Sequence, residues 1–114
     1  MKIFKPYLND ILNSIISIEK FVKKMNYNEF IEDDKTSSAV LRKLEIIGEA
    51  TKNIPDEIRE KYSQIPWKGI SGLRDKLIHG YFEVDYKLVW GIIKTRIPSL
   101  KKVINQIIKE LEDK

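Results

Sequence analysis

The sequence has no cysteine and only one histidine, His79. The lack of cysteine excludes disulfides, zinc ribbons, iron–sulfur clusters and thiol nucleophiles, and it fits a reducing compartment such as the cytoplasm. With one histidine, a transition-metal site built by the protein would depend mainly on carboxylates, and the sequence shows no carboxylate cluster. We therefore expect chemistry without a metal and without any other cofactor.

Long apolar runs are also absent. None approaches the roughly 18 to 20 residues of a membrane-spanning helix, and no apolar segment with a cleavage site follows the first six residues. We therefore expect a cytoplasmic protein without a membrane partner. The 114 residues suit one domain, residues 1–114, with one core. The net charge of +4 favours a polyanionic partner without identifying it.

Apolar residues recur at steps of three and four along almost the whole chain, which predicts helices. Residues 26–28 indicate a break, and Pro98 predicts a kink in the last helix because it cannot donate to the carbonyl of Lys94. The first expected helix covers about residues 6–25, and the second starts between residues 33 and 37 and ends at 54. The other three cover about residues 56–62, 66–80 and 86–111. No segment predicts a strand. The expected fold is all-α, an up-and-down bundle of four to five helices.

The predicted helices carry more apolar surface than one core-facing stripe needs. The residues that flank the main stripes are Leu12, Ile16, Ile92, Val103 and Ile108. A wide core-facing stripe would explain them, and so would a second face that packs against a partner helix. Because a domain this small buries a limited core, we expect the second arrangement, most simply a two-fold homodimer.

His79 is the side chain whose ordinary pKa best allows it to give and take protons near neutral pH. Asp75 precedes it by four residues, so on a continuous helix its carboxylate would face the imidazole and could fix its tautomer. Arg74 precedes His79 by five residues, about 140° around an ideal helix. Arg74 and His79 would converge only if the helix unwinds toward Gly80, or if they come from two subunits. A lone histidine is more often structural, and Arg74 could simply pair with Glu45, Glu49 or Asp75.

These residue types suit the cleavage of RNA. A neutral imidazole can take the proton from a ribose 2′-hydroxyl, or an imidazolium can protonate the leaving oxygen. A guanidinium can hold the phosphate and stabilise the charge that grows on its oxygens. The substrate supplies the nucleophile, so no serine, cysteine or metal is required, and DNA would not react by this route.

Arg74-x4-His79-x-Tyr81 resembles the R-x4-6-H motif of HEPN domains, in the R-x4-H-x-Y form of the HepT toxins. The resemblance covers about residues 5 to 112. Its blocks are Arg42-Lys43-Leu44-Glu45-Ile46-Ile47-Gly48-Glu49-Ala50, Ile65-Pro66-Trp67-Lys68-Gly69-Ile70, Gly72-Leu73-Arg74-Asp75, Leu77-Ile78-His79-Gly80-Tyr81, and Val84-Asp85 followed by Val89-Trp90.

The resemblance implies a helical homodimer whose two motifs line a shared cleft. It implies a metal-independent endoribonuclease toxin with Arg74 and His79 as catalytic residues and Asp75 in a supporting position. It also implies a small MNT-type nucleotidyltransferase as antitoxin, which would transfer AMP to Tyr81 and place negative charge beside the site. Without the resemblance, Tyr81 would be an ordinary half-buried ring.

Gly48 lies inside a predicted helix, where glycine costs about 1 kcal/mol relative to alanine. We expect a close approach of two helices there, which would bring Glu45 and Glu49 near the motif. For Glu49 a salt bridge is the simpler expectation than a direct role in the site. Trp67 and Trp90 are expected in the core.

Two other functions stay open at this point. The chain could be a non-catalytic HEPN subunit that binds a nucleotidyltransferase and is AMPylated by it. It could also be a structural dimerisation module in which Arg74 and His79 only join a hydrogen-bond network.

Overall fold

The structure is a computed structural model, and it describes residues 4–79 and 83–113. These residues form eight α-helices and one pair of short strands. In chain order they are α1 (Lys5–Val22), α2 (Tyr27–Glu32), α3 (Asp34–Thr51), α4 (Asp56–Lys61), α5 (Trp67–Ser71), α6 (Leu73–Leu77), β1 (Ile78–His79), β2 (Glu83–Val84), α7 (Tyr86–Lys94) and α8 (Arg96–Glu112). The expected all-α class is confirmed, since the strands make only a small hairpin.

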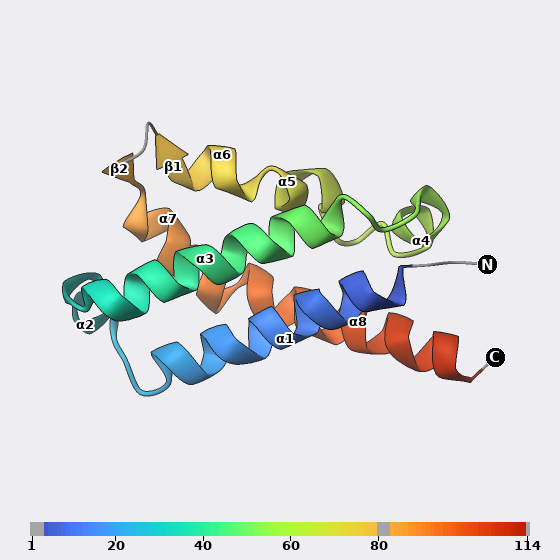
Figure 1. Cartoon of the computed structure of the whole chain (residues 1–114), viewed down its shortest axis with the longest axis horizontal. Helices are drawn as coiled ribbons and strands as arrows, with labels where there is room; N and C mark the ends of the chain where they lie inside the picture. The colour runs from blue at the N-terminus through green and yellow to red at the C-terminus, as the bar shows by residue number, and fades with distance from the viewer. Residues whose placement is uncertain (1–3, 80–82, 114) are drawn as a thin grey trace.

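The helices form four rods that run alternately in opposite directions (Figure 1). The first rod is α1, the second α3, the third α5 with α6, and the fourth α7 with α8. Helix α1 packs against α3 and α8, and α3 also packs against α5 and α6. The hairpin and α2 lie at one end of the 45 Å long axis, and α4 lies at the other (Figure 1). The predicted up-and-down bundle is confirmed.

Buried side chains from all four rods form the core. The largest fully buried ones include Leu8, Ile11, Ile15, Phe30, Leu44, Ile47, Leu77, Leu100 and Ile104. Trp67 is buried, and its indole N–H donates a 3.0 Å hydrogen bond to the Tyr62 carbonyl. Trp90 is half-buried, and its ring centroid lies 5.2 Å from that of Phe30. Both tryptophans are therefore packing residues, as expected. None of the helices in the described ranges is long and apolar enough to cross a membrane.

Side-chain caps set the starts of α2 and α3. Asn26 begins α2 with a capping box, in which its side chain accepts from the Glu29 N–H and the Glu29 carboxylate accepts from the Asn26 N–H. The break predicted at residues 26–28 is therefore wrong in part, because α2 begins at Tyr27. Asp33 begins α3 by accepting from the Thr36 N–H at 2.9 Å, and this hydrogen bond holds the pKa of the Asp33 carboxyl below its ordinary value. The start of α3 lies where it was expected.

The last rod divides at Thr95, between α7 and α8. The Thr95 hydroxyl donates to the Gly91 carbonyl at 2.7 Å and closes the end of α7. Pro98, the position of the expected kink, lies in the first turn of α8. Its missing N–H costs nothing there, because first-turn amides have no partner within the helix. The break in the last rod therefore lies at Thr95, three residues before the proline at which a kink was expected.

The third rod is not the continuous helix expected over residues 66–80. Gly72 separates α5 from α6, and α6 ends at Leu77, because Ile78 takes extended backbone angles (φ −118°, ψ 118°). Strand β1 then pairs antiparallel with β2, with Ile78 opposite Val84 and His79 opposite Glu83. The expectations of a single motif helix and of no strand are both wrong. Local hairpin pairing has replaced the last helical turn.

The backbones of α3 and α5 approach closely at Gly48. A Cβ atom at this position would lie 3.2 Å from the Ile70 carbonyl oxygen and 3.5 Å from that of Ser71. The expected close approach is therefore confirmed, and it places the face of α3 that carries Glu45 beside α6.

This contact predicts opposite effects of one substitution at two glycines. Gly91, in α7, has no atom within 4 Å of its would-be Cβ, so Gly91→Ala should raise the free energy of unfolding by up to about 1 kcal/mol. Gly48→Ala should instead lower it by about 1 kcal/mol, because overpacking outweighs the gain in helix propensity. Urea denaturation of both variants measures the difference, and equal stabilisation by the two alanines would refute the tight contact.

Candidate active site around Arg74 and His79

Arg74 projects from α6 toward α3. Its neighbours Leu73 and Leu77 are buried in the core, while Arg74 itself is exposed. The Arg74 Nε donates to the Glu45 Oε2 over 3.1 Å, and the two side chains are 61% and 30% exposed. Of the three carboxylates considered as partners from the sequence, the structure selects Glu45. Glu49, one turn later on α3, pairs with Lys52 instead.

His79 is exposed on β1, two residues after the end of α6. The hydrogen bond from the Asp85 N–H to the Leu77 carbonyl, 2.9 Å long, closes the hairpin that carries it. Because α6 ends at Leu77, the angle of 140° calculated for a continuous helix does not apply to Arg74 and His79. The unwinding considered from the sequence therefore occurs, before Gly80 is reached.

Asp75 is exposed on α6. The helical face that it was expected to share with His79 does not exist, because His79 is in a strand. No hydrogen bond joins these two residues, both of which the structure describes. Gly80 and Tyr81, the remaining motif positions, lie outside the described residues.

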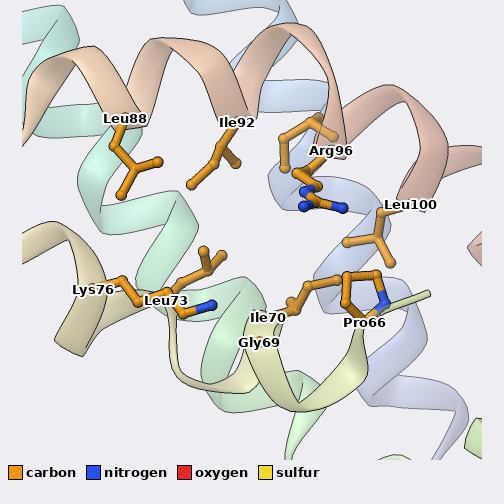
Figure 2. Close-up of a pocket in the computed structure, with 10 residues that line it drawn as sticks. Pro66, Gly69, Ile70, Leu73, Lys76, Leu88, Ile92, Arg96 and Leu100 are labelled. Carbon is orange, nitrogen blue, oxygen red and sulfur yellow. The ribbon is translucent and has the colours of Figure 1, made fainter.

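A groove of about 150 Å³ separates α5 and α6 from α7 and α8 (Figure 2). Its lining is mostly apolar and includes Ile70, Leu73, Ile92 and Leu100, and the Lys76 and Arg96 side chains reach into it (Figure 2). The groove does not include Arg74, which turns toward α3 instead.

A second hollow, of about 290 Å³, lies between α1 and α3. Polar side chains line much of it, including Asp10, Arg42, Glu45 and Glu49. Glu45 thus belongs both to this hollow and to the ion pair with Arg74. Among residues 4–79 and 83–113, no three His, Asp or Glu side chains are grouped so as to hold a metal ion.

The geometry leaves both motif side chains open to a large substrate. Arg74 uses only its Nε in the bond to Glu45, so its two terminal nitrogens can form a bidentate contact with a phosphate. The exposed imidazole of His79 can exchange a proton with a bound ribose or a leaving oxygen.

The chain matches the family model described as "Ribonuclease HepT-like" over residues 11–107. The protein belongs to the HepT-like ribonuclease family. The matched range contains every motif position from Arg74 to Tyr81, and it also contains Glu45 and Gly48. The resemblance stated from the sequence is confirmed.

Two curated relatives match this HepT-like chain over nearly their whole length. "Putative RNase MJ0125" of Methanocaldococcus jannaschii is 53% identical over 110 residues, which cover 96% of this chain and 95% of the relative. "Probable ribonuclease HepT" of Thermococcus cleftensis is 46% identical over 105 residues, which cover 92% and 96%. No solved structure matches the chain.

Proposed function

We propose that this protein is a metal-independent endoribonuclease toxin that cleaves RNA with Arg74 and His79 as catalytic residues. One observation carries the proposal: the exposed Arg74 bonds the Glu45 carboxylate through its Nε alone, so its two terminal nitrogens stay available, and an exposed His79 follows it five residues later in the family motif. Membership of the HepT-like ribonuclease family supports RNA as the substrate. The names of the relatives, which describe RNases, agree.

The proposed reaction is an in-line attack of a ribose 2′-hydroxyl on the adjacent phosphorus. A neutral His79 imidazole accepts the hydroxyl proton as the new P–O bond forms. Arg74 binds the non-bridging oxygens and stabilises the charge that grows on them. The bond to the 5′-oxygen breaks, and an imidazolium supplies the proton to this leaving oxygen. The products are a 2′,3′-cyclic phosphate and a 5′-hydroxyl. Asp75, exposed beside Arg74, is proposed as a supporting carboxylate.

His79→Ala and Arg74→Ala should each lower kcat/KM for single-stranded RNA by about 10²- to 10³-fold, because each removes a group that acts in the transition state. Cleavage by the wild type should persist in excess EDTA and leave 2′,3′-cyclic phosphate ends, and DNA of the same sequence should stay intact. Arg96→Ala, which removes an exposed arginine from the groove, is the matched control. Unchanged cleavage by both motif variants would remove the assignment.

A homodimer is part of the proposal, with the two motifs facing each other across a shared cleft. The exposure of Arg74 and His79 supports it, because a single chain does not enclose them. Two chains would also supply two imidazoles, one to accept the proton and one to donate it.

A dimer-built cleft predicts that activity per chain depends on concentration. Sedimentation should give a species of twice 13.4 kDa, and dilution into monomer should lower RNA cleavage per chain in parallel with the loss of dimer. A 13.4 kDa species with undiminished activity per chain would exclude the shared cleft.

Tyr81 is the proposed control point, and an MNT-type nucleotidyltransferase is the proposed cytoplasmic partner. The transferase would move AMP from ATP to the tyrosine hydroxyl and release pyrophosphate. The added phosphate would repel RNA and compete for Arg74.

A small gene beside this one with a nucleotidyltransferase motif would supply the enzyme to test. With ATP labelled at the α-phosphate, it should label the wild type and the control Tyr7→Phe but not Tyr81→Phe. Labelled protein should lose RNA cleavage. If Tyr81→Phe is labelled as strongly as the wild type, Tyr81 is not the site. If labelling occurs while the unmodified protein cuts no RNA, the chain is instead the non-catalytic partner subunit.

A further inference from the structure

Arg74 has a long, flexible side chain and lies on a short helix. Helix α6 has only five residues, and the Arg74 side chain is 61% exposed, so on its own it would sample many rotamers. In the part of the chain that the structure describes, its one hydrogen bond is the bond from Nε to Glu45. This bond engages the guanidinium through its Nε–H and leaves the two terminal nitrogens without a hydrogen bond to a described residue.

Glu45 has a much firmer support than Arg74. It lies in the middle of α3, which has 18 residues, and its neighbours Leu44 and Ile47 are fully buried. Three residues later, Gly48 seats the same helix against the Ile70 carbonyl of α5. The backbone of Glu45 is therefore fixed by the core, and only 30% of its side chain is exposed.

We propose that Glu45 is a positioning residue that holds Arg74 in the orientation needed to bind the scissile phosphate. This inference rests on the proposed ribonuclease function. Glu45 acts only through Arg74 and does not touch the substrate. A misplacement of about 1 Å in a phosphate-binding group can cost about 10²-fold in rate, which is why a fixed guanidinium would matter.

Electrostatics separates this role from a passive one. A carboxylate beside the phosphate site repels RNA, so removing a merely neighbouring acid should strengthen RNA binding and leave kcat unchanged. Removing a positioning acid should lower kcat while KM stays the same or falls. The split between kcat and KM therefore reports the role.

Glu49 provides a matched control. It lies four residues after Glu45 on the same helix, lines the same hollow and carries the same charge, but it pairs with Lys52 and makes no bond with Arg74. Glu45→Ala should lower kcat by about 10- to 100-fold, while Glu49→Ala should stay within about two-fold of the wild type. In Glu45→Gln the side-chain oxygen can still accept from the Arg74 Nε–H, so this variant should keep most of the wild-type kcat. Its activity would also show that the protein still folds without the charge at position 45.

A measurement without activity completes the test. In ¹⁵N spectra of the arginine Nε–H groups, the Arg74 signal should be protected from exchange in the wild type and in Glu45→Gln, and lose that protection in Glu45→Ala. Arg59, whose Nε donates to the Ile54 carbonyl, is the internal reference. If Glu45→Ala has the same kcat as Glu49→Ala while Arg74→Ala is inactive, the positioning role of Glu45 is refuted and the proposed ribonuclease function is retained. If the wild type cuts no RNA, the proposed function itself fails.

Discussion

The contact of α3 with α5 at Gly48 is the constraint on which the rest of the site depends. Two helix backbones can approach this closely only where one of them carries no side chain. The contact sets the distance between α3 and the third rod, and therefore the position at which the Glu45 carboxylate meets Arg74. A larger residue at position 48 would push apart the two elements that form the ion pair. The glycine thus matters to the site without taking part in its chemistry.

Most of the fold could be predicted because its determinants are periodic or local. The steps of three and four along α1, α3 and α8 reveal the buried faces of those helices, and Asp33 marks the start of α3. The short elements are harder to predict from the sequence. Helix α2 has six residues, too few for a period to show, and only the pairing of Asn26 with Glu29 indicated it. The division of the motif segment at Gly72 and Leu77 depends on tertiary contacts and hairpin pairing, which a helical pattern does not reveal.

The candidate site was predictable in its residue types but not in its local geometry. The order of Arg74, Asp75 and His79 marks the candidate segment, and the family resemblance predicts its chemistry. The assumption of a continuous helix then produced an angle that separated Arg74 from His79 and a shared face that joined Asp75 to His79. Both followed from extending one helix past the point where the chain becomes extended. The partner of Arg74 lies 29 residues earlier in the sequence, so spacing alone left Glu45 as one of three alternatives.

The orientation of the bundle has a practical consequence for any attached module. Helix α1 begins and α8 ends at the same end of the long axis, and the hairpin with His79 lies at the opposite end (Figure 1). A fused domain, an affinity tag or a surface linked beyond either of these helices would therefore join the molecule far from the motif. The protein can therefore be tethered beyond either helix without the attachment lying beside the hairpin that carries His79.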